Sequence, residues 1–155
     1  MFVCLGNICR SPMAEGAFRA AAQRAGLDCE IASSGTASYH IGEPPDPRAI
    51  ATAKANGVDI STYRGQQLSR HDFYEFTHIF ALDKANLEGA RAREPNDGTA
   101  QVALLLDLVE GREGEAVKDP YYGDESDFAA VWEEVSVAAE ALVARFTKAN
   151  VATSE

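Results

Sequence analysis

The sequence predicts an α/β domain of three layers, with a central four-stranded parallel sheet and helices on both faces. Strand and helix signals alternate along the 155 residues, a length that suits a single domain. Residues 77–82 form a compact apolar run of the kind found in buried parallel strands. Apolar residues after Asp127 recur at the spacing of a helix that packs on a core. We expect residues 1–150 to form the domain and residues 151–155 to form a flexible tail.

The first half of the chain is predicted to hold two strands and two helices. Residues 2–4 begin the first strand, and residues 12–24 form a helix that a glycine closes. Residues 29–34 form the second strand. A loop dense in glycine and proline, residues 36–47, precedes a helix at residues 48–56.

The second half begins with a short helix, for which Ser69 and Asp72 resemble a capping box. The strand at residues 77–82 leads into a helix at residues 83–93. That helix ends before Pro95, because the residue that precedes a proline disfavours the helical conformation.

The last two predicted elements are a fourth strand at residues 102–106 and a long helix from about Asp127. The apolar residues of this helix are Phe128, Val131, Trp132, Val135, Ala138, Ala139 and Leu142. We expect Trp132 to lie in the core rather than to line a ligand site, and we expect Cys29 of the second strand to be a core residue as well.

The segment between the first strand and the first helix is the most informative part of the chain. Its sequence is Cys4-Leu5-Gly6-Asn7-Ile8-Cys9-Arg10-Ser11. Gly6 and Asn7 are residue types that adopt positive φ readily, which turns successive N–H groups toward a common centre. The amino end of the next helix adds positive potential, which favours the thiolate form of a cysteine in the loop. Arg10 offers a planar fork that grips two oxygens of a phosphate.

Together these residues predict a phosphate cradle with Cys4 as a nucleophile in its floor. We expect the Ser11 hydroxyl to cap the helix or to donate to the thiolate, and Pro12 to take the first helical position. The alternative is a buried strand that ends in a structural cysteine, with Arg10 in solvent. Open α/β sheets bind ligands beyond the carboxyl ends of their strands, so we expect other functional loops, such as residues 83–86, at the same edge.

A second informative stretch, Asp119-Pro120-Tyr121-Tyr122-Gly123-Asp124, precedes the terminal helix. Phosphate monoesters are among the compounds that hydrolyse most slowly without a catalyst. A carboxylic acid on a loop above the cradle can protonate the departing oxygen and can then activate water. The competing interpretation of Asp119 is an ordinary turn residue before a proline. We assign Asp124 and Asp127 to solvent or to the start of the helix.

These two motifs resemble those of a known family. The octapeptide at Cys4 is similar to the phosphate loop of the low-molecular-weight protein tyrosine phosphatases, and the second stretch is similar to their Asp-Pro-Tyr-Tyr-Gly signature. Further resemblances lie at Ser34-Gly35-Thr36, Gly42-Glu43-Pro44-Pro45-Asp46-Pro47-Arg48, Gln67-Leu68 and Ala81-Leu82-Asp83. The resemblance implies a phosphate loop after the first strand and hydrolysis of phosphotyrosine through a phosphocysteine intermediate, without metal or cofactor. The implied partners are tyrosine-phosphorylated proteins, with phosphate or another oxyanion in the loop.

The resemblance also assigns roles to individual residues. It implies that Cys4, Arg10 and Asp119 are catalytic, with Asp119 acting first as general acid and then as general base. The implied substrate-binding residues are Leu5, Gly6, Asn7, Ile8, Cys9, Ser11, Tyr39, Tyr121 and Tyr122. Tyr39 and Tyr121 are expected to form opposite walls of a slot for phosphotyrosine. Cys9 either fills space behind the loop or forms a reversible disulfide with Cys4 that shields the thiolate from oxidation.

Three features depart from the family pattern. Tyr63 stands where relatives often carry a histidine that helps to hold the loop asparagine, and Gln66 replaces a frequent arginine. These two changes leave open how Asn7 is supported. Only three residues precede Cys4, whereas relatives have a longer first strand, so the strand is short or the start is truncated.

Three other functions compete with phosphotyrosine hydrolysis. An arsenate reductase on the same fold carries further cysteines at the place of residues 82–89, and this chain has none there. The protein-arginine phosphatases resemble this chain with threonine at the place of Ile8, so the isoleucine favours tyrosine. A non-catalytic phosphoprotein-binding module has no need to retain both Cys4 and Asp119.

The composition narrows the range of partners and compartments. A net charge of −10 argues against nucleic acid and against anionic membranes as partners. The three cysteines form neither an even framework nor a zinc pair, and no signal peptide opens the chain, so we expect a metal-free cytoplasmic protein. The histidines, His40, His71 and His78, are predicted to be non-catalytic, and His40 is the best placed to touch substrate because it follows Tyr39.

Overall fold

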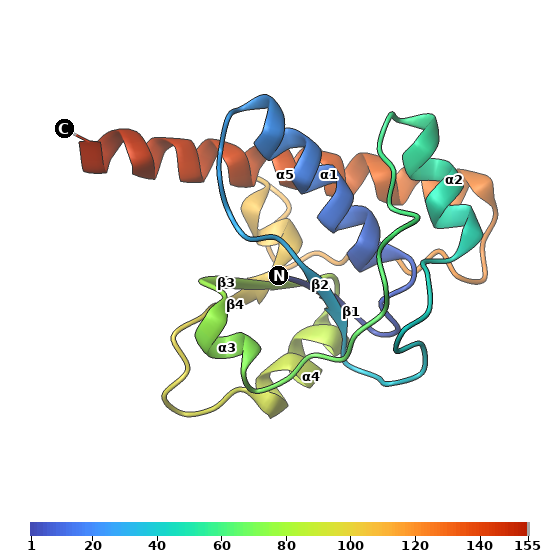
Figure 1. The fold of residues 1–155 in the computed structure, drawn as a ribbon, viewed down its shortest axis with the longest axis horizontal. Coiled ribbons are helices and arrows are strands. Elements are labelled where there is room, and N and C mark those ends of the chain that lie inside the picture. The colour runs from blue at the N-terminus through green and yellow to red at the C-terminus, as the bar shows by residue number, and fades with distance from the viewer. Residues whose placement is uncertain (155) are drawn as a thin grey trace.

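The computed structural model describes the backbone of residues 1–154 and the side chains of residues 1–148. Its centre is a four-stranded sheet with the order β2-β1-β3-β4, in which every pairing is parallel (Figure 1). The strands are β1 (Phe2–Cys4), β2 (Ser33–Gly35), β3 (His78–Ala81) and β4 (Gln101–Leu104). The predicted four-stranded parallel sheet is therefore confirmed.

Helices cover both faces of the sheet, as the sequence predicts. One face carries α1 (Arg10–Arg24), α2 (Pro47–Ala55) and α5 (Glu125–Ser154), and the other carries α3 (Asp72–Glu75) and α4 (Lys84–Arg93) (Figure 1). A short 3-10 helix, η1 (Leu105–Leu108), follows β4. The tail predicted at residues 151–155 begins within α5 and ends outside the described residues, so its flexibility stays a prediction.

Alternate strand residues point into two separate cores. Phe2 faces α1, where its ring meets that of Phe18 edge to face, with the centroids 5.8 Å apart. Val3 and Ile79 are fully buried on the opposite side of the sheet, in the smaller core with residues of α3 and α4. This alternation is what a strand covered on both faces requires. Each large apolar side chain buried in this way contributes about 1.5–3 kcal/mol to folding.

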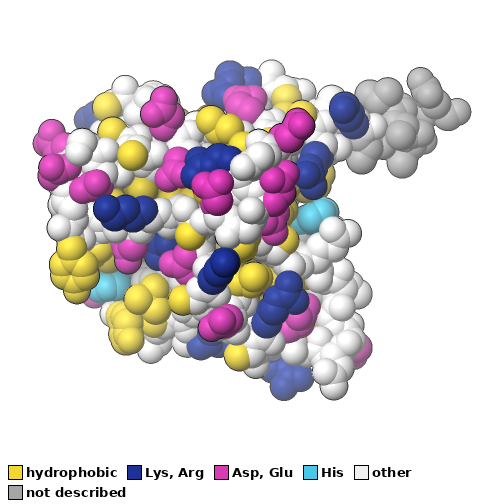
Figure 2. Space-filling view, turned by 180° about the vertical axis from the view of Figure 1, so that it is seen from behind, with side chains coloured by type: hydrophobic (Ala, Val, Ile, Leu, Met, Phe, Trp, Pro, Cys, Tyr) yellow, Lys and Arg dark blue, Asp and Glu magenta, His cyan; other side chains and the backbone are white. Residues whose placement is uncertain are grey.

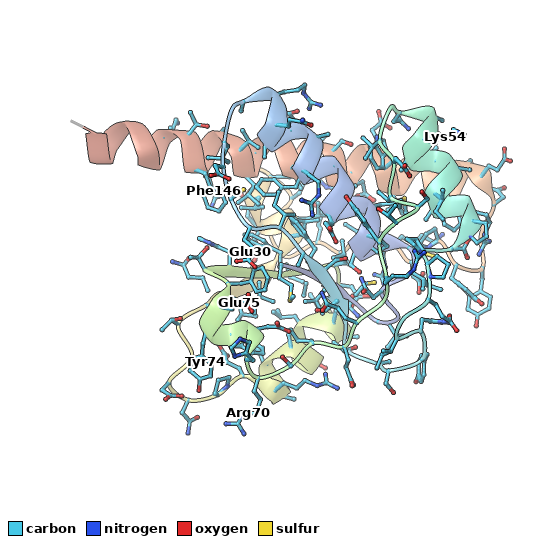
Figure 3. All side chains as sticks on the ribbon, in the orientation of Figure 1. Glu30, Lys54, Arg70, Tyr74, Glu75 and Phe146 are labelled. Atoms are coloured by element: carbon cyan, nitrogen blue, oxygen red, sulfur yellow. The ribbon has the colours of Figure 1, made fainter. Side chains whose placement is uncertain are left out.

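The apolar stripe of α5 lies in the larger core. Trp132 is only 9% exposed, so its predicted place in the core is confirmed. Phe146 lies on the side of α5 that faces the sheet (Figure 3), and its ring meets Phe18 and His78 at centroid distances of 6.3 and 5.1 Å. Cys29, which is also expected in the core, is half-buried at its edge.

Three strands are shorter than predicted. β3 spans His78–Ala81 instead of residues 77–82, and the differences in β2 and β4 follow from the lengths of their partners. β2 begins at Ser33 instead of residue 29, because its partner β1 has only three residues to pair with. β4 ends at Leu104 instead of residue 106, because Leu104 already pairs with the last residue of β3. The chain then turns into η1, where the Asp107 carboxylate accepts the N–H of Leu104 at 3.3 Å.

Aspartate side chains accept backbone N–H groups at the starts of α3 and α5. At α5, Asp124 accepts the N–H of Ser126 at 3.0 Å and donates its own N–H to Asp127 at 2.9 Å, so both aspartates have the predicted helix-start role. At α3, the N–H of Ser69 donates to Asp72 at 2.9 Å, which is one half of the predicted capping box.

The surface carries both signs of charge. On the face drawn in Figure 2, Asp and Glu side chains are interspersed with Lys and Arg side chains, and the described residues form no continuous basic area there. Within the part of the chain that the structure describes, no helix combines the length and the apolar character needed to cross a bilayer.

β1 lies at the topological switch point of the sheet, where the strand order reverses. After β1 the chain adds β2 on one side, and it later adds β3 and β4 on the other side. The crevice beyond the carboxyl ends of the strands at such a point is the usual ligand site of an open parallel sheet. Cys4 ends β1 and Asp83 follows β3, so both residues lie at this crevice.

Candidate active site

The phosphate loop turns tightly from β1 into α1. Asn7 has a φ of 59°, the left-handed conformation predicted for it. The prediction is wrong for Gly6, which is not in that conformation; the glycine instead packs closely beside the His40 ring, because a Cβ atom would lie 3.1 Å from its Cδ2. α1 begins at Arg10, before the predicted start at Pro12, and no side chain caps it. The open N–H groups at the start of this helix therefore remain available to an anion.

Asn7 is buried behind the loop and holds its shape. Its side-chain amide donates to the hydroxyl oxygens of Ser11 at 2.8 Å and of Ser33 at 3.0 Å, and its oxygen accepts the N–H of Gln66 at 3.0 Å. The Ser33 hydroxyl donates in turn to the buried Glu15 carboxylate at 2.7 Å. Both donors and the acceptor of the Asn7 amide are thus engaged, and the loop is organised before any ligand binds.

Tyr63 points its hydroxyl at Arg19 instead of at Asn7. The hydroxyl accepts from Nε of Arg19 at 3.2 Å, and the guanidinium lies 5.7 Å from the centre of the Tyr63 ring. Gln66 supports the loop in its place, since its side-chain amide also donates to the Ser33 carbonyl at 2.9 Å. The two departures from the family pattern therefore leave Asn7 fully supported.

We expect Asn7→Ala to lower the free energy of unfolding by about 2–4 kcal/mol, because it leaves buried polar groups without partners and places alanine in the left-handed conformation. Urea denaturation measures this loss. Asn56→Ala is the matched control: Asn56 is exposed and its amide donates to the Thr52 carbonyl at 2.9 Å. Asn56→Ala should lower the free energy of unfolding by less than about 1 kcal/mol. Equal losses in the two variants would contradict the support that we assign to Asn7.

Cys4 lies at the floor of the loop with its thiol buried. Its Sγ lies at hydrogen-bond distance, 3.0 Å, from the hydroxyl oxygen of Ser11, and Ser11 does not cap the helix. Cys9 lines the same cavity, and burial raises the pKa of its thiol far above the ordinary range, which keeps it protonated at neutral pH. Both cysteines are free thiols, and the disulfide between them stays a prediction.

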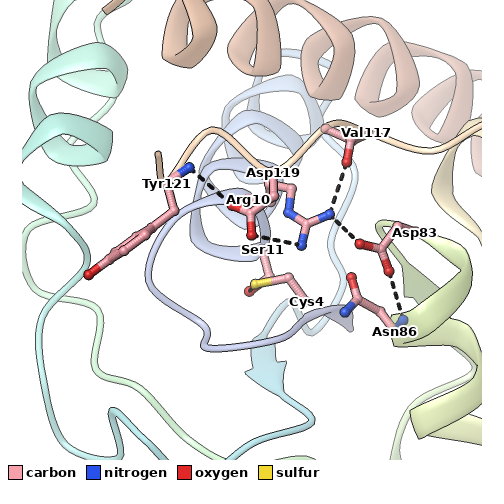
Figure 4. Close-up of polar contacts among 8 residues, drawn as sticks. All are labelled: Cys4, Arg10, Ser11, Asp83, Asn86, Val117, Asp119 and Tyr121. Carbon is pink, nitrogen blue, oxygen red and sulfur yellow. Dashed lines mark hydrogen bonds and ion pairs between the residues drawn. The ribbon is translucent and has the colours of Figure 1, made fainter. Parts of the chain in front are cut away.

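Two acceptors aim the guanidinium of Arg10 into the site. Its Nη1 donates to Oδ2 of Asp83 at 2.7 Å and to the Val117 carbonyl at 2.9 Å (Figure 4). Arg10 is only 3% exposed, which excludes the alternative of an arginine in solvent. Its Nη2 lies 3.8 Å from Oδ2 of Asp119, so the third predicted catalytic residue lies at the same place.

Asp83 and Val117 are absent from the predicted site residues. The Asp83 carboxylate also caps α4 by accepting the N–H of Asn86 at 2.7 Å, and the N–H of Val117 donates to the Leu82 carbonyl at 2.8 Å. The position of Asp83 after a buried strand is the signal that predicts a functional loop at residues 83–86, but it does not predict the contact of Asp83 with Arg10. Val117 contributes its backbone carbonyl, and because every residue has one, the residue type gives no signal for this role.

Asp119 lies above the cavity on the loop before α5. Its side chain is 47% exposed, and its Oδ1 accepts the N–H of Tyr121 at 3.1 Å (Figure 4). A carboxyl group that faces both the cavity and solvent can pass a proton to a bound group and recover it from water. The geometry therefore suits a general acid and base.

Most of the predicted site residues line one cavity of about 260 Å³. They are Cys4, Leu5, Gly6, Ile8, Cys9, Arg10, Tyr39, Asp119, Tyr121 and Tyr122. His40 lines the cavity too, and its Nδ1 lies 2.6 Å from the Glu43 carboxylate. Asn7 and Ser11 lie outside this lining, buried behind the loop.

Known proteins resemble this chain in sequence and in fold. The family model "Low molecular weight phosphotyrosine protein phosphatase" matches residues 1–152. The protein of that name from Schizosaccharomyces pombe is 41% identical over 131 residues, which cover 83% of each chain. A crystal structure of protein tyrosine phosphatase from Entamoeba histolytica has a TM-score of 0.87 at 33% identity, over 96% of both chains. A drosophila arginine phosphatase has a TM-score of 0.86 at 31% identity, over 94% of this chain and 95% of that one. The chain belongs to the low molecular weight phosphotyrosine protein phosphatase family.

Proposed function

We propose that this chain hydrolyses phosphotyrosine in proteins, with Cys4 as nucleophile, Arg10 as phosphate ligand and Asp119 as general acid and base. The observation that carries the proposal is the convergence of these three side chains on one cavity. They come from the end of β1, the start of α1 and the loop before α5, three segments that only the folded chain brings together.

The reaction proceeds in two displacements at phosphorus. In the first, the Cys4 thiolate attacks in line, the S–P bond forms, the P–O bond to tyrosine breaks, and the Asp119 carboxyl gives its proton to the departing oxygen. In the second, water attacks the phosphocysteine and the Asp119 carboxylate accepts a proton from it. The S–P bond then breaks, which releases inorganic phosphate and regenerates the thiolate.

Arg10 and the N–H groups of the phosphate loop hold the equatorial oxygens of the phosphoryl group. Asp83 and Val117 fix the Arg10 fork in advance, and Asn7 fixes the loop. Donors placed before the reaction need no reorganisation as charge develops, which is the main source of electrostatic catalysis. Phosphate or another oxyanion is therefore expected to bind in the same loop.

An aromatic rim favours an aryl substrate. Tyr39 and Tyr122 are 72% and 95% exposed around the cavity mouth, and Tyr121 meets Tyr122 edge to face at 4.9 Å. A phosphotyrosine ring reaches this rim while its phosphate lies in the loop, whereas phosphoserine is too short to do both. The selectivity is modest, since an aromatic pair is worth about 0.5–1.5 kcal/mol beyond its buried area.

Phosphoarginine is the competing substrate, because the fold resembles that of an arginine phosphatase. Ile8 lines the cavity of this chain. This branched apolar residue stands where the arginine phosphatases carry threonine, and it favours phosphotyrosine over phosphoarginine as the substrate. An arsenate reductase is less well supported, since residues 82–89 contain no relay cysteine. A binding module without turnover leaves the placement of Asp119 above the cavity unexplained.

Turnover of para-nitrophenyl phosphate and of a phosphotyrosine peptide, each with and without EDTA, tests the proposal. We expect both substrates to be hydrolysed, the chelator to have no effect, and a phosphoarginine peptide to react more slowly. Phosphopeptide binding without turnover would favour the binding module instead. Faster release of phosphate from phosphoarginine would make arginine the preferred substrate.

We also propose a cytoplasmic location. The nucleophile acts only as a reduced thiol, and Cys4, Cys9 and Cys29 are all free. Free thiols of this kind persist in reducing compartments. Loss of turnover on mild oxidation, with recovery on addition of a thiol reductant, is the expected behaviour.

A further inference from the structure

Arg48, in the first turn of α2, is bound tightly to Asp46 just outside the cavity. Its Nε donates to one carboxylate oxygen of Asp46 at 3.1 Å and its Nη2 donates to the other at 2.9 Å, which is the bidentate pairing that arginine favours. This hydrogen bonding lowers the pKa of the Asp46 carboxyl below its ordinary value, so the pair is ionised at neutral pH. The same carboxylate caps α2 by accepting the N–H of Arg48 at 2.8 Å. The guanidinium therefore has a fixed orientation.

Asp46 is itself attached to the phosphate loop. Its backbone N–H donates to the Ile8 carbonyl at 2.8 Å, and Ile8 lines the cavity. The Asp46 side chain is only 10% exposed, so this connection lies inside the molecule. The position of Arg48 is thus tied to that of the phosphate loop.

The other side of Arg48 contacts residues 119–124, which we name the acid loop. Its guanidinium carbon lies 5.6 Å from the centre of the Tyr121 ring and 4.6 Å from that of Phe128 in α5, both within cation–π range. Its Nη1 donates to the Gly123 carbonyl at 3.4 Å. Arg48 therefore lies between the acid loop and the phosphate loop and contacts both sides.

The acid loop has few other polar attachments. Its own hydrogen bonds stay within the loop or reach the start of α5, such as the bond from the Gly123 N–H to the Pro120 carbonyl at 2.8 Å. Among the described residues, its polar links toward the phosphate loop are the bond from Arg48 to Gly123 and the 3.8 Å approach of Arg10 to Asp119. The second of these belongs to the reacting groups. In the described part of the chain, the hydrogen bond from Arg48 to Gly123 is therefore the polar link between the two loops that does not involve the reacting groups.

We propose that Arg48 is a positioning residue that holds the acid loop over the phosphate loop and thereby places Asp119 at the departing oxygen. This inference rests on the proposed role of Asp119 as general acid. Arg48 lies outside the cavity lining, so its effect on the reaction passes through Asp119. Lysine cannot replace it, because an ammonium group lacks both the fork that binds Asp46 and the plane that stacks on a ring.

Hydrogen exchange tests the attachment without any need for turnover. In Arg48→Lys, the amides of Tyr121, Gly123 and Asp124 should exchange about 5–10 times faster than in the wild-type chain, the factor expected when a cation–π contact and a hydrogen bond are lost. Exchange rates that remain unchanged would overturn the proposal.

Arg112→Lys is the matched control for the exchange experiment. Arg112 is exposed to a similar extent, 37% against 39% for Arg48, and it also binds carboxylates, those of Glu115 and Glu134. Arg112→Lys should leave the hydrogen exchange rates of the acid loop unchanged. Equal acceleration in both variants would mean general loosening and would overturn the specific role of Arg48.

Kinetics then tests whether the attachment serves the proton transfer. Arg48→Lys should lower kcat/KM for a phosphotyrosine peptide by about tenfold and for para-nitrophenyl phosphate, whose leaving group needs little protonation, by less than about threefold. In an Asp119→Asn background it should change kcat/KM for the peptide by less than about twofold, because its effect depends on that carboxyl. Uniform losses on both substrates, or full additivity, would reduce Arg48 to a merely structural role. If the wild-type chain hydrolyses neither substrate, the proposed function fails, and the exchange rates still decide whether Arg48 holds the loop.

Discussion

Cys4→Ser should abolish phosphotyrosine hydrolysis, with kcat/KM lowered by about 10⁴- to 10⁶-fold, as for other enzymes that lose their nucleophile. A serine hydroxyl stays protonated in the loop and needs a base to attack phosphorus. The side-chain group at hydrogen-bond distance from the sulfur is the Ser11 hydroxyl, at 3.0 Å, which is not a base. Steady-state kinetics measures the loss, and mass spectrometry after acid quenching should detect the phosphorylated peptide that contains Cys4 in the wild-type chain only.

The same variant should still bind an oxyanion, because Arg10 and the loop N–H groups remain in place. Calorimetry with inorganic phosphate separates this loss of chemistry from a loss of folding. Cys29→Ser is the matched control, since Cys29 is half-buried and lines a different pocket, beside Phe2 and Phe18. It should leave kcat/KM unchanged. Substantial turnover by Cys4→Ser would exclude a phosphocysteine intermediate.

The parts of the site that come from one continuous segment are the parts that the sequence predicts best. In the phosphate loop, the strand end, the left-handed Asn7 and the following helix are neighbours, so local chemistry determines their geometry, although the helix starts at Arg10 instead of Pro12. The place of the loop follows from a general rule for parallel sheets, which puts ligand sites beyond the carboxyl ends of the strands. The approach of Asp119 to Arg10 is a long-range contact that composition and periodicity do not predict, and the family resemblance supplied it.

The features that escape prediction depend on contacts between distant segments. The acceptor that Val117 offers to Arg10 is a backbone carbonyl, and it exists only because the chain before α5 passes over the end of β3. Gly6 is predicted to adopt a positive φ, but what the structure shows is its close packing beside the His40 ring. The ends of β2 and β4 are set by the lengths of their partner strands, which neither strand's own sequence encodes.

Asp119→Asn should lower kcat/KM for a phosphotyrosine peptide by about 10²- to 10⁴-fold, and that for para-nitrophenyl phosphate much less. Asparagine keeps the size of the side chain and an oxygen that accepts the Tyr121 N–H, bound at 3.1 Å in the wild-type chain, so the loop should keep its shape. What is lost is the proton. A tyrosine phenol has a pKa of about 10, so its oxygen departs poorly as an anion. A series of aryl phosphates with increasingly acidic phenols should therefore show a steep dependence of kcat/KM on the leaving group in Asp119→Asn and a shallow one in the wild-type chain.

The two proposed roles of Asp119 act in different steps, and the kinetic constants separate them. kcat/KM covers the reaction up to phosphocysteine formation and reports the general acid, whereas kcat also includes the attack of water and reports the general base. With para-nitrophenyl phosphate, Asp119→Asn should therefore give a burst of one product per enzyme followed by slow turnover, because the first step needs little acid and the second has lost its base. Asp124→Asn, in the same loop, is the control: asparagine also caps a helix, so both constants should stay at the wild-type level. An unchanged kcat/KM for the phosphotyrosine peptide in Asp119→Asn would remove Asp119 as the acid, and the absence of a burst would remove it as the base.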